Sequence, residues 1–162
     1  YADVGRGLEG FLRLCAANDV QGMLAPDLAP FEAENVTMVA RALNLAVFTL
    51  LDARADDAAV ARAATLGDVV YLKAAAGRTG QSADLDGELG AQIADVMGRL
   101  RAITPGLLVA VGIGVQLPDQ VAALARLGVD MVIVGTKIVE HLQTGEESLV
   151  RYIRELKAAA RG

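Results

Sequence analysis

Aromatic residues, cysteine and long apolar stretches are scarce in this sequence. Phe and Tyr make up 4% of the 162 residues, Trp is absent, and Cys15 is the only cysteine. A single thiol cannot form a disulfide or a cysteine-based metal site within the chain. The longest apolar run lies around Leu107 to Val115, and it is much shorter than the ~20 residues that a membrane span needs. We therefore expect a cytoplasmic protein that crosses no membrane.

Basic clusters and metal-ligating clusters are also missing. The formal net charge is −5, and the 15 Lys and Arg residues are scattered along the chain. Nucleic-acid binding requires a basic stripe or patch, so we expect no nucleic-acid partner. His141 is the only histidine and falls late in a predicted helix, where it cannot build a metal site by itself. We expect no metal site.

What the sequence does contain is an alternation of short β-branched runs with longer amphipathic runs. This alternation is typical of repeated βα units, and no linker divides the chain. We predict a single α/β domain over residues 1–162 with an all-parallel sheet. The predicted strands are 21–25, 46–51, 69–73, 107–111 and 131–134, and the predicted helices are 8–17, 32–43, 56–65, 86–102, 118–127, 136–142 and 146–160.

Two architectures fit five such units. A doubly wound open sheet accommodates five strands without remainder. A (β/α)₈ barrel of the TIM type needs eight strands and about 250 residues, so this chain would supply about five of its βα units. The periodicity slightly favours the open sheet, whereas the motifs favour the barrel.

Two glycine motifs follow consecutive strands near the end of the chain. Gly112-Ile113-Gly114 follows the fourth predicted strand, and Gly135-Thr136 follows the fifth and opens a helix. Glycine lets the backbone approach a phosphate, and a helix N-terminus supplies free N–H groups. In barrels the loops after the last two strands commonly form such a phosphate cup. The alternative is that both motifs are tight turns that need positive φ.

A third motif and two carboxylates follow other strands. In Gly77-Arg78-Thr79-Gly80, Arg78 is either an anion clamp or a solvated side chain, and Thr79 with Gly80 suits a loop that folds over a ligand. Asp27 and Asp52 also follow strand ends, where barrel enzymes place catalytic groups. For Asp52 we favour capping or solvation, and for Asp27 the surface of the barrel mouth.

Taken in order, these segments resemble the tryptophan synthase alpha subunit family over the whole chain. The resemblance rests on Pro26-Asp27-Leu28, on Val69 to Gly80, on Val111 to Gly114 with Pro118, and on Val132 to Val139. It implies that the chain is the C-terminal portion of a (β/α)₈ barrel, from about strand four. The family cleaves indole-3-glycerol phosphate to indole and glyceraldehyde 3-phosphate, without a metal or organic cofactor.

The resemblance also assigns the candidate binding residues. It places the substrate phosphate on Gly80, Gly114, Gly135 and Thr136, with Tyr71 lining the pocket, and Thr79 and Gly112 complete the predicted binding set. The implied partner is the pyridoxal-phosphate-dependent beta subunit. The partner-facing loops depart from the family at Asp3, at Ala29 and at 52–54.

Lys73 is the other departure, because the family usually has an apolar residue there. It shares a strand face with Tyr71. It is therefore a weak catalytic candidate, either as a Schiff-base nucleophile or, as we favour, as an electrostatic partner of a ligand phosphate.

We predict that the 162-residue chain alone does not catalyse the family reaction. The family's acid–base Glu and Asp lie at the ends of its first two strands, before the segment that this chain matches. Tyr1 in place of Met suggests a truncated chain, and the alternative is that only an initiator Met is missing. Incubation with indole-3-glycerol phosphate should release no indole above background, because cleavage needs an acid and a base. Robust turnover by a verified monomer would contradict this. The alternatives are a non-catalytic phosphate-binding half-barrel module and a related barrel enzyme with another phosphorylated substrate.

Overall fold

The protein forms five consecutive βα units. The computed structural model describes residues 7–24, 30–73, 85, 87–112 and 114–161. The strands are β1 (Gly22–Leu24), β2 (Ala46–Asp52), β3 (Val69–Lys73), β4 (Leu108–Gly112) and β5 (Met131–Ile133). The helices are α1 (Gly7–Ala17), α2 (Pro30–Ala42), α3 (Asp57–Leu66), α4 (Glu88–Ile103), α5 (Pro118–Arg126), α6 (Thr136–Thr144) and α7 (Glu146–Ala159).

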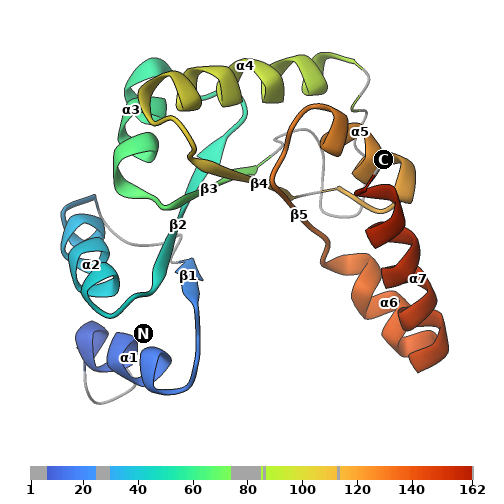
Figure 1. Cartoon of the computed structure of the whole chain (residues 1–162), viewed down its shortest axis with the longest axis horizontal. Helices are drawn as coiled ribbons and strands as arrows, with labels where there is room; N and C mark the ends of the chain where they lie inside the picture. Colours follow the sequence, from blue (N-terminus) through green and yellow to red (C-terminus); the bar gives the residue numbers. More distant parts are fainter. Residues whose placement is uncertain (1–6, 25–29, 74–84, 86, 113, 162) are drawn as a thin grey trace.

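The strand order decides between the two predicted architectures. All neighbouring strands are parallel, and their order in the sheet is β1-β2-β3-β4-β5. A doubly wound sheet reverses its strand order at a switch point, and this sheet does not. The helices lie along the outer side of a curved sheet whose inner side is open (Figure 1). The chain therefore forms part of a TIM-type barrel, as the motifs indicated.

The two faces of the sheet differ in burial. Leu72 of β3 and Val109 of β4 point toward the helices and are fully buried. On the inner face, Leu24, Leu108 and Ile133 are 36%, 41% and 37% exposed. Successive strand residues point to opposite faces, so the core with the helices lies on the outer face. On the inner face Val69 and Ala110 of the central strands are also buried.

The apolar core lies between the strands and the outer helices in two clusters. The larger cluster joins the outer face of β2 to β4 with α3, α4 and α5, and the smaller one joins α1 and α2 to β2. Burying a Leu, Ile or Val side chain contributes about 1.5–3 kcal/mol. The largest fully buried side chains are Leu12, Leu72, Ile93, Leu100, Leu124, Val60, Val70, Val96, Val109, Val111 and Val121.

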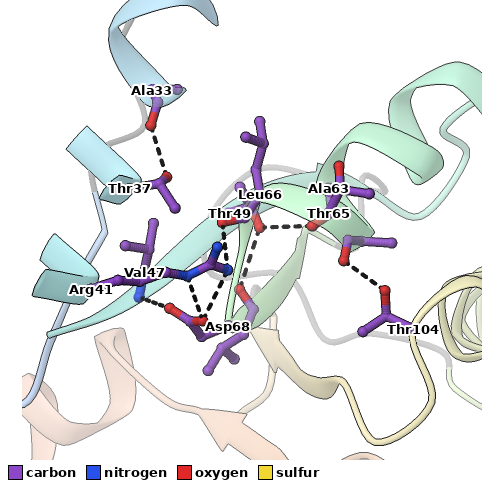
Figure 2. A network of polar contacts seen from close by, with 12 residues as sticks. Ala33, Thr37, Arg41, Val47, Thr49, Ala63, Thr65, Leu66, Asp68 and Thr104 are labelled. Carbon is purple, nitrogen blue, oxygen red and sulfur yellow. Dashed lines mark hydrogen bonds and ion pairs between the residues drawn. The ribbon is translucent and has the colours of Figure 1, made fainter. Parts of the chain in front are cut away.

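An aspartate just before β3 ties the start of that strand to its neighbour. The carboxylate of Asp68 accepts a hydrogen bond from the backbone N–H of Val47 at 2.8 Å, and the Asp68 N–H donates to the Val47 carbonyl at 2.9 Å. The same carboxylate pairs with Arg41 of α2 at 3.0 Å. Figure 2 shows Asp68 between Arg41 and Val47.

The same arrangement recurs two strands later. The Asp130 carboxylate, just before β5, accepts from the Val109 N–H at 2.8 Å and pairs with Arg101 of α4 at 2.9 Å. The Asp130 N–H donates to the Val109 carbonyl at 3.0 Å. Both aspartate clamps lie at the N-terminal edge of the sheet, which in barrels serves stability.

Most predicted element boundaries agree with the structure to within two residues. Helix α2 begins at Pro30 rather than at 32, because proline suits the first helical position. Strand β4 ends at Gly112 rather than at 111, and α6 continues to Thr144 rather than 142. In the described part of the chain, no helix combines the length and apolar character that a membrane crossing requires.

We predict that Asp68→Ala and Asp130→Ala each lower the free energy of unfolding by about 1–2 kcal/mol. The loss comes mainly from the strand N–H left without its acceptor, because ion pairs that are partly exposed contribute little. Urea denaturation measures the change. Glu155→Ala on exposed α7 is the control and should stay within about 0.5 kcal/mol. Equal values for all three variants would contradict a structural role for the clamps.

Candidate functional site

The carboxyl ends of β2 to β5 meet at one edge of the sheet. Asp52, Lys73 and Gly112 are aligned in register across β2, β3 and β4, and Ile133 of β5 continues the row. We call these four residues the mouth row. Their side-chain direction alternates with that of buried Leu72, so the row belongs to the open inner face. This edge is where barrel enzymes bind their substrates.

Tyr71 lies one level below the mouth row and packs on Gly112. A Cβ atom at Gly112 would lie 2.7 Å from Cε2 of the Tyr71 ring, and the Tyr71 hydroxyl would be nearer still. Burial raises the pKa of the Tyr71 hydroxyl, so it is a protonated hydrogen-bond donor at neutral pH. The structure thus gives Gly112, a predicted phosphate residue, a packing reason to be glycine.

Gly114 has a backbone reason to be glycine. Its φ is +76°, in the left-handed region that other residues avoid. The loop then leads into α5, where the Gln120 Oε1 accepts from the N–H groups of Gln116 and Leu117 at 2.8 and 3.1 Å. For Gly114 the positive-φ interpretation is confirmed, and the turn brings its backbone to the edge of the mouth.

Gly135 behaves differently from Gly114. It is the N-cap of α6 with φ −112°, so its backbone conformation does not require glycine. A Cβ at this position would meet nothing within 4 Å, so packing does not require it either. The positive-φ interpretation of this second motif is therefore wrong. The remaining effect of glycine at this position is that no side chain occupies the space in front of the N-terminus of α6.

The N-terminus of α6 also differs electrostatically from those of other helices. Its first turn has no acidic residue, no side chain caps it, and Thr136 and Lys137 open it. Carboxylates near a helix N-terminus neutralise its positive potential, so a helix without them keeps that potential for an anion. Helices with an acidic residue in the first turn carry Glu9, Asp57, Glu88, Asp119, Glu146 and Glu147.

Lys73 and Asp52 are neighbours in the mouth row. Lys73 is half-buried at the end of β3. The Asp52 carboxylate accepts from the Arg54 backbone N–H at 2.9 Å and lies 3.5 Å from the Arg54 Nε. Asp52 therefore closes a local turn, which is consistent with the structural role favoured from the sequence. Lys73 provides the one lysine or arginine side chain in the mouth row.

The remaining candidates are placed as follows. His141 stacks on Tyr152 with ring centroids 4.2 Å apart, and its Nδ1 lies 2.9 Å from the Ser148 Oγ. Among the described residues, no group of three or more His, Cys, Asp and Glu side chains could hold a metal ion. Thr79, Gly80, Arg78 and Asp27 lie outside the described residues.

The sequence analysis did not predict the contacts that hold the loops next to the mouth row against the outer helices. Tyr152 of α7 donates a hydrogen bond from its hydroxyl to the Gln116 carbonyl at 2.8 Å. Arg99 of α4 holds the start of α3 through the Asp57 carboxylate at 2.6 Å and the Ala55 carbonyl at 3.1 Å. The signal available in the sequence was the aromatic Tyr152 at helical spacing from Leu149 and Leu156 on the apolar face of α7.

This geometry can be set beside known proteins. Residues 4–161 match the family model described as tryptophan synthase alpha chain. The chain belongs to the tryptophan synthase alpha chain family. Among relatives with this name, that of Dehalococcoides mccartyi is 33% identical over 154 residues, covering 93% of this chain, and that of Caulobacter vibrioides is 34% identical over 147 residues, covering 89%.

Solved structures of the family agree in fold. A tryptophan synthase structure from Mycobacterium tuberculosis superimposes with a TM-score of 0.83 at 28% identity, covering 98% of this chain and 59% of that one. A mutant tryptophan synthase alpha-subunit from Pyrococcus furiosus gives 0.76 at 26%, covering 95% and 62%. The chain spans 58% and 50% of the Dehalococcoides and Caulobacter relatives.

We predict that Gly112→Ala costs about 1–3 kcal/mol of stability, because the new methyl group must displace the Tyr71 ring. In a Tyr71→Phe background the cost should be smaller, since the hydroxyl is the nearest atom to the new Cβ. Urea denaturation of the four proteins of this double-mutant cycle measures the coupling. The same cost in both backgrounds would show that Tyr71 is not the residue that Gly112 accommodates.

Proposed function

We propose that the protein binds the phosphate of a small phosphorylated substrate between the loop after β4 and the N-terminus of α6. The observation that carries this proposal is Gly135: neither its backbone conformation nor its packing requires glycine, and it leaves an uncapped helix N-terminus open. Gly114 and Thr136 supply the adjoining backbone N–H groups. We call Gly114, Gly135 and Thr136 the phosphate cup.

Family membership supports one substrate for this proposal. In the longer protein of this family, we propose, the substrate is indole-3-glycerol phosphate, which is cleaved to indole and glyceraldehyde 3-phosphate. Binding energy from a phosphate remote from the reacting bond can position the substrate for chemistry elsewhere. The described part of the chain would thus supply binding and orientation, with Tyr71 on the pocket wall. The acid and the base would come from the earlier strands of the family barrel.

A cytoplasmic location and a beta subunit that receives the indole belong to the same proposal. Residues 52–54, one of the segments that depart from the family, form a tight turn in which Ala53 is buried and its N–H donates to the Lys73 carbonyl at 3.1 Å. This turn is part of the sheet edge itself, so it offers a partner a rigid surface rather than an adaptable loop.

We predict that Gly135→Leu abolishes measurable binding of glycerol 3-phosphate while the fold stays intact. The new side chain would occupy the open space in front of α6, and nothing within 4 Å of its Cβ would be displaced. Isothermal titration measures affinity, and urea denaturation should show a loss of at most about 1 kcal/mol, the cost of leucine in place of an N-cap glycine. Gly98→Leu at an exposed position of α4, where a Cβ also meets nothing within 4 Å, is the matched control. Unchanged affinity in Gly135→Leu would exclude the cup.

We predict that Lys73 attracts the ligand phosphate electrostatically and forms no Schiff base with a carbonyl group of the ligand. Lys73→Met should weaken glycerol 3-phosphate binding about 3- to 10-fold, and Lys73→Arg should retain it, as expected for a charge-assisted contact. Lys157→Met on exposed α7 is the control. Borohydride treatment with glyceraldehyde 3-phosphate should leave no adduct on Lys73 in mass spectrometry. An adduct there would instead assign Lys73 as a Schiff-base nucleophile.

A further inference from the structure

The two halves of the phosphate cup belong to different βα units. Gly114 lies in the loop after β4, whereas Gly135 and Thr136 follow β5. Helix α6 has no buried residue of its own, so core packing does not fix its position. A phosphate that contacts both halves needs them at a constant spacing. Pairing of Gly112 with Ile133 sets the spacing at the base of the two loops, and a contact beyond the strands is needed to hold the start of α6 itself relative to the β4–α5 loop.

Tyr152 contacts the elements that carry both halves. It is 5% exposed and is the buried residue of α7. Its ring stacks on His141 of α6 with a centroid distance of 4.2 Å and an interplanar angle of 19°. Its hydroxyl donates to the Gln116 carbonyl, two residues after Gly114, at 2.8 Å.

The groups on either side of Tyr152 are themselves held. The Gln116 N–H donates to the Gln120 Oε1 at 2.8 Å, so both backbone polar groups of Gln116 are bonded. On the other side, His141 lies 2.9 Å from the Ser148 hydroxyl of α7, which closes the α6–α7 hairpin. Burial raises the pKa of the Tyr152 phenol. At neutral pH the phenol therefore keeps the proton that it donates to Gln116.

We propose that Tyr152 is a positioning residue that holds the β4–α5 loop and the N-terminus of α6 at the spacing one phosphate group bridges. This inference rests on the proposed phosphate cup. Tyr152 does not touch the ligand; it acts through Gln116 and His141. Loss of its hydroxyl frees the loop while the aromatic stack on α6 remains.

The test is isothermal titration of the 162-residue chain with glycerol 3-phosphate and, separately, with inorganic phosphate. Tyr152→Phe should weaken both about 3- to 10-fold, the equivalent of one neutral hydrogen bond. Asp68→Ala is the matched control, because it destabilises the opposite edge of the sheet and should leave phosphate affinity unchanged. Parental affinity in Tyr152→Phe, or an equal loss in Asp68→Ala, would overturn the positioning role.

A second measurement separates this inference from the proposed function. Amide hydrogen exchange without ligand should be faster in Tyr152→Phe at residues 114–117 and 136–138, and unchanged at the start of β3. If the parent chain binds no phosphate, the proposed function fails, and the exchange data alone then decide whether Tyr152 holds the two segments. Unchanged exchange at both segments would overturn the inference.

Discussion

Parallel pairing of each strand with its neighbour in the chain is the constraint on which this structure depends. Because every strand runs in the same direction, all five carboxyl ends meet at one edge, and all the βα loops gather there. The register then places Asp52, Lys73 and Gly112 in one row, although they lie far apart in the sequence. Chemistry and binding are thereby concentrated at a single edge.

The two edges of the sheet carry different kinds of contact. At the N-terminal edge, Asp68 and Asp130 each satisfy a strand N–H and pair with an arginine of an earlier helix. At the C-terminal edge, Gly135 is exposed and Gly114 is half-buried, and neither places a side chain over its own backbone. Tyr152 connects this open edge to the packed helices behind it. Rigidity and accessibility are thus supplied by separate residues, as a binding site on a stable scaffold requires.

Local patterns in the sequence predicted the elements, and the requirement of Gly114 for positive φ followed from its turn. The strand order did not follow from periodicity, because five apolar strands fit an open sheet equally well; the glycine motifs favoured the barrel. The Tyr152 and Asp130 contacts join residues 36 and 21 positions apart, which local patterns do not report. An aspartate immediately before a strand, seen twice, was a signal that could have indicated the clamps. Gly135 was predicted in the cup, but its φ could not be read from its residue type.

The most direct test of the phosphate cup is an NMR titration of the ¹⁵N-labelled 162-residue chain with glycerol 3-phosphate, in which the amide chemical shifts are measured at each ligand concentration. Phosphate held by backbone N–H groups should shift the amides of Gly114, Gly135, Thr136 and Lys137 most strongly and saturably. The amides of Asp68 and Asp130, at the opposite edge of the sheet, should not move. The absence of saturable shifts at these amides, or larger shifts at the opposite edge, would contradict the account.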